Sequence, residues 1–360
     1  MAKIYPLGDI HAMPLPAKEK PSPRRYGHLV LLLFILLPIF TPFVTVRAQT
    51  SLPNQIYLPL ILNPAPTNVS SPALPTWLEL INRYRAQATL PVLQENAQWS
   101  NGAEKHAIYM VKNDLITHKE DPNNPWYTPE GDEAGRNSNV MISSSLTFTE
   151  TQAIDLWMQG PFHALGILHP RLEKTGFGIY REDIGTYRTA AALDVLRGRI
   201  PTLPLIVSFP IFWPGNGQTI TLNRYNGGES PDPLAPCDGY TPPSGTPIMI
   251  QLGNGSLSPL VKHSDLRWQG KSLPHCIYTE NTYINPNVSQ QDLARSILNA
   301  QDAIILIPQA PLEAGRYSVS VTVSASPNAS DTTYTWAFDV VSSVTPQSLN
   351  EDPNDGAQTQ

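Results

Sequence analysis

Two histidines and a group of carboxylates are the residues of this 360-residue chain whose types could support a reaction. The histidines are His118 and His163. An acidic loop that begins at the first of them carries five carboxylates, those of Glu120, Asp121, Glu130, Asp132 and Glu133. Two neutral imidazoles and one carboxylate supply three ligands of an open zinc site, and zinc held in this way activates a water molecule. One hypothesis is therefore a divalent-metal-dependent hydrolase with zinc on His118 and His163, and with Glu130 or Glu133 as the carboxylate ligand.

The same residues also suit a structural role. No His-Glu-x-x-His sequence places two histidines on one helix face, and an imidazole that hydrogen-bonds a loop backbone needs no metal. No serine stands in a Gly-x-Ser-x-Gly frame, and both cysteines lie far down the chain. His106 lies on the apolar face of a predicted helix, where packing explains it. The sequence leaves enzymatic activity open and favours its absence, with no cofactor assigned beyond a candidate zinc.

Composition narrows the class of protein. The formal net charge is −6 with acidic and basic residues interspersed, so we expect no nucleic-acid partner. There are 37 prolines, and only 15% of residues are charged. This balance is typical of an exported protein with extended connectors rather than of a helical cytosolic enzyme.

The first 75 residues indicate export. A basic stretch that ends at Arg25 precedes the apolar run 29–46, and Ala48 suits the residue before a signal cleavage site. The run is about as long as a short membrane span, so an uncleaved anchor is the alternative, and the only membrane contact expected is through this segment. We therefore predict a secreted or cell-surface protein. The predicted organisation is an export signal (1–48), a proline-rich linker (49–75), a first domain (76–200), a connector (201–244), a second domain (245–341) and a disordered tail (342–360).

The first domain combines three predicted helices with a late hairpin. Thr76 and Glu79 form a capping box for a helix that Pro91 ends. Apolar periodicity predicts further helices at about 97–112 and 149–159, and strands at 176–181 and 188–195. The prolines and glycines of 115–139 predict an irregular loop there, and Pro161 predicts a loop that presents His163.

Several motifs of this domain resemble one family when taken in order. They are Leu80-Ile-Asn-Arg-Tyr-Arg, Ala103-x-x-His106-Ala107-x-x-Met110, Leu115-x-x-His118, Trp157-Met-x-x-Pro-x-His163 and Gly176-Phe-Gly178. Together they resemble the bacterial branch of the CAP superfamily (cysteine-rich secretory, antigen 5 and pathogenesis-related proteins, also called SCP-like), over about residues 76–200. The resemblance implies an α-β-α sandwich and an extracellular role.

The resemblance also implies a central cleft with two histidines and two carboxylates. His118 and His163 match the family's histidines, whereas the Gly-Glu-Asn carboxylate is replaced in Gly135-Arg136-Asn137 and the Trp-x-x-Glu carboxylate by Gly160. An arginine beside imidazoles disfavours a cation. The groove expected from this set is lined by His118, Arg136, Asn137, Trp157 and His163.

The C-terminal half is predicted to consist of strands. Alternating or apolar runs stand at 247–252, 302–307, 315–323 and 333–340, separated by turn residues. They predict an all-β immunoglobulin-like sandwich, so that the fold class is α+β. Cys237 and Cys276 are the only cysteines, and export favours a disulfide between them over two free thiols.

Three functions follow. The first is an extracellular binding protein with an unknown peptide, glycan or lipid ligand at the groove framed by His118 and His163. The second is the metal-dependent hydrolase, and the third is a structural surface module whose immunoglobulin-like half makes the contacts. Export, two modules and an incomplete catalytic set favour the first.

Overall fold

The computed structural model describes residues 3–5 and 75–342. The predicted export signal, linker and tail lie outside the described residues, except for 3–5, 75 and 342. Within the described ranges, no helix is long and apolar enough to cross a membrane.

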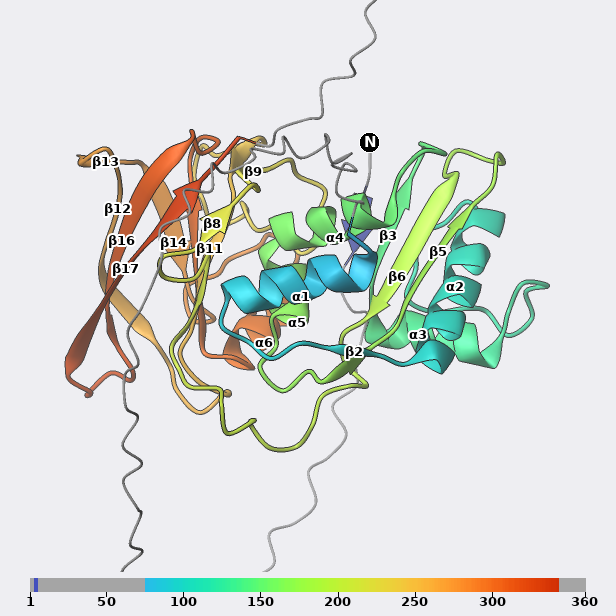
Figure 1. Ribbon diagram of the computed structural model, residues 1–360, viewed down its shortest axis with the longest axis horizontal. Helices are drawn as coiled ribbons and strands as arrows, with labels where there is room; N and C mark the ends of the chain where they lie inside the picture. Colours follow the sequence, from blue (N-terminus) through green and yellow to red (C-terminus); the bar gives the residue numbers. More distant parts are fainter. Residues whose placement is uncertain (1–2, 6–74, 343–360) are drawn as a thin grey trace, which may run out of the picture. The chain divides into compact units, whose positions relative to one another are not determined.

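The first half of the described chain alternates helices and short strands (Figure 1). Its elements are β1 (Lys3–Tyr5), α1 (Trp77–Gln87), β2 (Gln94–Glu95), α2 (Ala97–Lys112), α3 (Pro129–Asn137), β3 (Ser138–Ser143), α4 (Glu150–Gln159), α5 (Pro161–Ile167), β4 (Lys174–Thr175), β5 (Phe177–Arg181) and β6 (Thr189–Asp194). The three helices predicted for this half, after the Thr76 cap and at about 97–112 and 149–159, are confirmed as α1, α2 and α4. The capping box of α1 is present, because the Thr76 hydroxyl accepts from Glu79 N and the Glu79 carboxylate accepts from Thr76 N.

Two segments predicted to be loops contain helices, for one physical reason. The segment 115–139 contains α3, which begins at Pro129, and the segment expected to present His163 as a loop is α5, which begins at Pro161. Proline lacks an N–H and has a fixed φ, and both properties suit the first position of a helix. The prolines therefore start these helices rather than break them, and His163 lies within α5.

The first half forms three layers, as the predicted α-β-α sandwich requires. A four-stranded antiparallel sheet has the order β1-β3-β6-β5. Val140 and Ala192 face one side, where they pack against α2, whereas Met141 and Ala191 face the other side and join the core that contains α1, α4 and α5. The alternation of side chains along a strand therefore feeds two separate cores.

The second half contains mainly strands (Figure 1). They are β7 (Ile211–Trp213), β8 (Thr219–Ile220), β9 (Arg224–Tyr225), β10 (Ser244–Gly245), β11 (Ile248–Gln251), β12 (Leu260–Trp268), β13 (Lys271–Ser272), β14 (His275–Tyr278), β15 (Ala303–Pro308), β16 (Gly315–Ser324) and β17 (Asp331–Val340), with one helix, α6 (Val288–Asn299). All four predicted strands are present, whereas α6 was not predicted. The immunoglobulin-like arrangement stays a prediction.

The strands of this half form two larger sheets. One has the order β14-β15-β11-β7 and the other β13-β12-β16-β17-β8. β7 and β8 come from the segment 201–244, which the sequence suggested to be a connector. Their pairing with β11 and β17 makes part of that segment an edge of each sheet.

The core is continuous between the two halves. Tyr84 of α1 packs edge-on against Trp213 of β7, with ring centroids 5.4 Å apart. Phe162 of α5 packs in the same way against Tyr283, at 5.5 Å. These aromatic contacts belong to one cluster of buried side chains that runs from Leu80 to Val340. The two halves thus share one buried core.

A buried arginine fixes the chain that follows α5. Arg85 is fully buried, and its guanidinium donates to the carbonyl oxygens of Pro91, Ile167, His169 and Leu172 at 2.7–3.1 Å. Burial lowers the pKa of Arg85 to about 9. Because four carbonyls satisfy its donors, the side chain holds the segment after His163 in place without a carboxylate partner.

Candidate functional site

One buried imidazole–carboxylate pair organises the acidic loop. The Nδ1 atom of His106 lies 2.9 Å from Oε1 of Glu120, and both side chains are fully buried. The Nε2 atom of His106 lies 2.8 Å from the Thr117 carbonyl oxygen. The second oxygen of Glu120 accepts from Thr128 N, the residue that caps α3. The pair therefore connects α2 to both ends of the loop.

His118 is held against the end of α3. Its Nδ1 atom lies 2.9 Å from the Gly135 carbonyl oxygen, and the residue is 7% exposed. The neighbouring Arg136 is exposed at the surface, where its Nε atom donates to Asp132 at 2.8 Å. Asn137 donates to the Glu133 carbonyl oxygen. Of the residues predicted to line a groove, these three therefore lie together at α3.

His163 forms the second buried pair, with a carboxylate from the other half of the chain. Its Nδ1 atom lies 2.7 Å from Oε1 of Glu229, and its backbone N–H donates to the same oxygen at 2.9 Å. The two side chains are 1% and 0% exposed. Burial raises the pKa of Glu229, while the hydrogen bonds from His163 oppose that rise. His163 thus contacts the second half directly.

Gly160 makes room for this carboxylate. A Cβ atom added at Gly160 would lie 2.6 Å from Cδ of Glu229. The backbone φ of Gly160 is −98°, which any residue can adopt, so the closeness of Glu229 is the constraint on this position. Gly160 stands where the family resemblance implies a carboxylate, and the structure puts the carboxylate of Glu229 against it.

Tyrosines surround Glu229 in the interior. The Tyr225 hydroxyl accepts from Glu229 N at 3.2 Å, and Tyr225, Tyr278 and Tyr283 are all buried. Burial raises the pKa of Tyr283 to about 12, and nearby Asp232 and Glu229 add to the rise. Each phenol is therefore neutral at ordinary pH, and the hydroxyls of Tyr225 and Tyr283 take part in hydrogen bonds.

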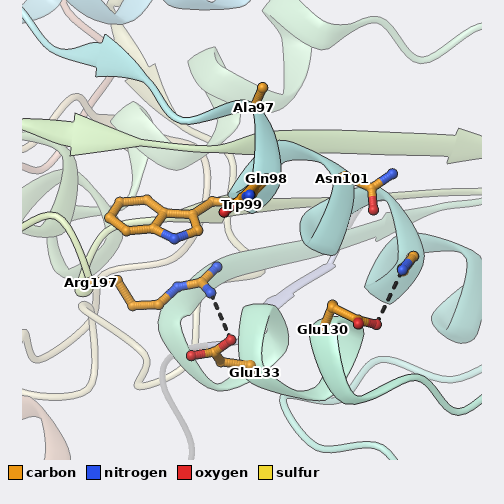
Figure 2. A pocket seen from close by; sticks show the side chains of 8 residues that line it. Ala97, Gln98, Trp99, Asn101, Glu130, Glu133 and Arg197 are labelled. Carbon is orange, nitrogen blue, oxygen red and sulfur yellow. Dashed lines mark hydrogen bonds and ion pairs between the residues drawn. The ribbon is translucent and has the colours of Figure 1, made fainter.

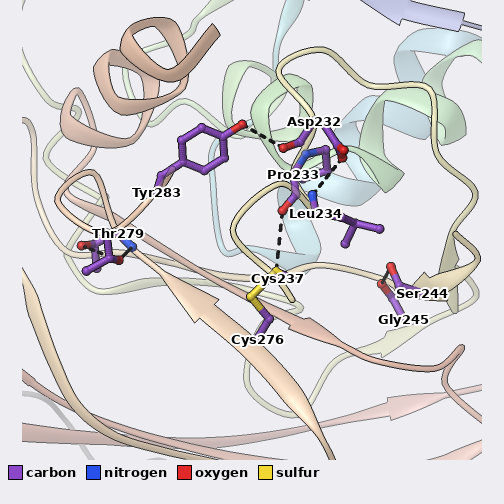
Figure 3. Close-up of a disulfide and its surroundings, with 10 residues drawn as sticks. Asp232, Pro233, Leu234, Cys237, Ser244, Gly245, Cys276, Thr279 and Tyr283 are labelled. Atoms are coloured by element: carbon purple, nitrogen blue, oxygen red, sulfur yellow. Dashed lines mark hydrogen bonds between the residues drawn. A yellow bond between two sulfur atoms is a disulfide. The ribbon is translucent and has the colours of Figure 1, made fainter. Parts of the chain in front are cut away.

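The disulfide holds the segment that carries Glu229. Cys237 and Cys276 are bonded, as predicted, with Cα atoms 5.6 Å apart (Figure 3). Cys276 lies in β14, so the bond ties the loop after Glu229 to the first sheet of the second half. In the same region the Tyr283 hydroxyl donates to the Asp232 carbonyl oxygen at 2.8 Å (Figure 3).

The remaining predicted residues lie elsewhere. Trp157 is fully buried and donates through Nε1 to the Val140 carbonyl oxygen, so it is a core residue. Glu130 pairs with Lys105 at 3.1 Å and Glu133 with Arg197 at 3.2 Å. Among the residues that the structure describes, no group of three histidine, cysteine or acidic side chains could hold a metal ion. Both carboxylates proposed as metal ligands thus face a cation of the chain itself.

A surface hollow of about 530 Å³ lies where α2 begins, opposite α3 (Figure 2). We call it the Trp99 hollow. Its lining residues are Ala97, Gln98, Trp99, Asn101, Lys105, Glu130, Glu133 and Arg197. Figure 2 shows Trp99 and Arg197 side by side at one end and Glu130 at the other. The Arg197 guanidinium lies 5.0 Å from the Trp99 ring centroid, and it also pairs with Asp194 and Glu133.

Sequence reasoning missed Glu229, Trp99 and Arg197. Glu229 is 66 residues from His163, and nothing in its neighbourhood marks it as a partner. Trp99 and Arg197 come from the start of α2 and from the turn after β6. The one available signal was a tryptophan in the first turn of a helix, between Gln98 and Ser100.

One comparison, with models of protein families, concerns the first half of the chain. A model of the cysteine-rich secretory protein family (CAP) matches residues 78–193. Among solved structures, an extracellular protein containing a SCP domain from Bacillus anthracis str. Ames is similar, with 20% identity and a TM-score of 0.26. The match covers 34% of this chain and 39% of that chain, so this chain spans about two fifths of that protein's length.

Two further structures have low similarity. CopC from Methylosinus trichosporium OB3b has 10% identity and a TM-score of 0.22, and the match covers 39% of this chain and 98% of that one. PcoC, a copper resistance protein from Escherichia coli, has 13% identity and a TM-score of 0.20, with 36% and 95% covered. No curated protein matches the chain. The family model and the three-layer sandwich coincide over the same residues, and residues 78–193 form a CAP domain of the cysteine-rich secretory protein family.

Proposed function

We propose that this protein is an extracellular binding protein whose CAP domain binds a neutral saccharide in the Trp99 hollow. The observation that carries the proposal is the composition of the hollow. It combines one aromatic ring, two side-chain amides and two ion pairs around a space of about 530 Å³.

The charges of the hollow favour a neutral ligand. Lys105 and Glu130 form one pair and Arg197 and Glu133 the other, so the lining carries no formal net charge. A charged peptide would have to displace one partner of a pair, which leaves the other unpaired. A lipid tail would lie against polar side chains and leave them without partners. A saccharide avoids both costs, because its hydroxyls donate and accept.

The shape of the lining also suits a sugar ring. Trp99 offers a flat apolar surface, and the Arg197 guanidinium, which lies over the ring, fixes the orientation of the indole. Gln98 and Asn101 present amides that each donate and accept hydrogen bonds. The apolar face of a pyranose can therefore stack on the indole while its hydroxyls contact the amides and the Glu133 carboxylate.

Three features support an extracellular location. The sequence predicts an export signal at 1–48, the first half is a CAP domain, and Cys237 and Cys276 are joined in a disulfide. Disulfides persist in oxidising compartments and are rare in the cytosol. The expected partner is therefore a saccharide outside the cell.

The groove first expected between His118 and His163 receives less support. His163 is 1% exposed and contacts Glu229, and Trp157 is buried in the core. The zinc-dependent hydrolase receives no support from Glu130 and Glu133, which face Lys105 and Arg197. We therefore place the ligand at the Trp99 hollow rather than at the histidines.

Calorimetric titration of the secreted protein with a panel of saccharides tests this proposal. Neutral oligosaccharides should bind the wild-type protein, and Trp99→Ala should weaken binding at least about tenfold, which is about 1.4 kcal/mol. Trp126→Ala is the matched control, because Trp126 is also a surface tryptophan under a cation, with Lys112 4.7 Å from its ring centroid. Equal losses in the two variants, or binding of acidic peptides or lipids alone, would refute the proposal.

A further inference from the structure

A second cavity lies where the CAP domain meets α6. Its volume is about 140 Å³, and its walls come from α5, the turn after β6 and the C-terminal part of α6. Apolar side chains dominate these walls, among them Phe162, Leu196, Leu293 and Ile297. At about 30 Å³ for each water molecule, the cavity has room for roughly four or five waters.

Arg199 is the charged residue of this cavity. Every other described residue that lines it is uncharged. The Nε atom of Arg199 donates to the Val195 carbonyl oxygen at 2.8 Å. No carboxylate lies within ion-pair distance of its guanidinium among the described residues, and the nearby Asp194 is paired with Arg197. The charge of Arg199 is therefore compensated by no carboxylate in contact with it.

Other cations reinforce the positive potential at this place. Burial and, to a smaller extent, nearby Arg171 lower the pKa of Arg199 to about 10, although Asp194 opposes the shift, so the guanidinium still carries its charge at neutral pH. His169, close to Arg199, has a pKa lowered to about 2 by burial and by Arg199, Arg171 and Arg85. This imidazole is therefore neutral and competes for no anion.

Gln301 supplies a hydrogen-bond acceptor that no donor of the described residues contacts. The residue is 3% exposed and lines the cavity, and its Oε1 atom has no hydrogen-bond partner among the described residues. A buried acceptor without a donor costs about 1–3 kcal/mol. A ligand that brings an O–H or N–H group to this oxygen would remove that cost.

We propose that this cavity binds a small carboxylic acid that carries a hydroxyl or amino group and a short apolar chain. The Arg199 guanidinium binds the carboxylate, the preferred anion for its planar set of donors. The Gln301 Oε1 atom accepts from the hydroxyl or amino group, and the apolar chain lies between Leu293 and Ile297. The cavity volume limits the ligand to a size near that of a five-carbon hydroxy acid.

Calorimetric titration of the full chain with 2-hydroxyisovalerate, valine and isobutylamine tests this site. The two acids should bind and isobutylamine, which has no carboxylate, should not. Arg199→Gln should weaken binding of the acids at least about tenfold, whereas Arg171→Gln should leave it within about twofold, because Arg171 does not line the cavity. Failure of both acids to bind the wild-type protein would overturn the proposal.

A second variant keeps the test decisive if Arg199→Gln does not fold. Ala300 is exposed at the edge of the cavity, so Ala300→Trp should close it without loss of the fold. Ser289→Trp, on the first turn of the same helix and outside the lining, is its control. Loss of acid binding in Ala300→Trp alone supports the site, and unchanged binding in Ala300→Trp contradicts it. None of these changes touches the Trp99 hollow, so either proposal can fail without the other.

Discussion

The buried histidines and the Trp99 hollow differ in the way they use charged side chains. In the interior, His106 and His163 each contact one carboxylate, and all four side chains are at most 1% exposed. At the hollow, Lys105 pairs with Glu130, whose side chain is 59% exposed. The partner of a surface charge can be replaced by a ligand at a small cost in free energy, whereas the partner of a buried charge cannot.

The difference shows that residue type alone does not distinguish a buried pair from an open surface site. Histidine and carboxylate are the side chains most used in catalysis, and that led the sequence analysis to His118 and His163. In the folded chain, His106 and His163 each have a buried carboxylate partner, and each of them joins segments of the backbone. The open surface belongs to residues whose types are less suggestive, such as Trp99 and Asn101.

The largest predicted effect comes from removing a buried histidine. His163→Ala leaves the Glu229 carboxylate buried without its imidazole, and we expect a loss of about 3–5 kcal/mol in the free energy of unfolding. His106→Ala should cost a similar amount through Glu120. Urea unfolding followed by circular dichroism measures both.

The two losses should differ in location. By hydrogen exchange, His106→Ala should raise exchange mainly in the loop 115–128, and His163→Ala mainly in the segment around Glu229 and in α5. The double change of His163 and Glu229 to leucine should cost less than His163→Ala alone, because it leaves no buried charge. A double variant that is as unstable as the single one would show that the pair is not the cause.

Alanine at two glycines should have smaller effects. In Gly160→Ala the new Cβ would meet the Glu229 carboxylate, and in Gly135→Ala it would meet the His106 ring. We expect each to cost about 1–3 kcal/mol, the usual range for overpacking. Gly166→Ala, whose Cβ would lie 3.1 Å from a methyl group of Val195, is the control with an expected smaller loss. Thermal unfolding would contradict this account if Gly166→Ala were the most destabilised.

The dependence of stability on pH should have opposite signs in the two regions. Burial raises the pKa of Glu229, so this carboxyl binds its proton more tightly in the folded chain than in the unfolded chain. The contribution of the protonated carboxyl to the free energy of unfolding is therefore lost as pH rises through the folded-state pKa. Hydrogen bonds to a backbone amide and to Lys105 lower the pKa of Glu130, so its contribution is present above the ordinary pKa and is lost as pH falls.

Glutamine variants separate these two contributions. As the pH falls through the raised pKa of Glu229 toward about 4.5, the wild-type protein should gain stability relative to Glu229→Gln. Relative to Glu130→Gln, the wild-type protein should lose a small amount of stability as the pH falls below about 4.5, near the ordinary pKa of a glutamate. Urea titrations at a series of pH values measure both differences, and the same sign for both would contradict the assignment of interior and surface.

Local signals in the sequence were sufficient for much of the fold. The capping box of Thr76 and Glu79 predicted the start of α1, and alternation predicted β16 and β17. Pro129 and Pro161 misled, because a proline that starts a helix looks in sequence like one that ends it. Local rules therefore worked where a single segment determines its own structure.

The candidate sites depend on contacts between residues far apart in the sequence, which rules for single segments do not describe. Glu229 reaches His163 across 66 residues, and Arg197 reaches Trp99 across nearly a hundred. Such pairs are set by the packing of the two halves on one core. The disulfide was the exception, because Cys237 and Cys276 had no other partner to choose.

Fluorine NMR of the protein labelled with 5-fluorotryptophan tests the central claim most directly. The chain has seven tryptophans, and each labelled indole gives a resonance that a single substitution assigns. Addition of a neutral oligosaccharide that binds the protein should shift the Trp99 resonance and leave the resonances of Trp126 and Trp157 in place. A shift of the Trp157 resonance, with Trp99 unchanged, would contradict the account and return the ligand to the region of His163.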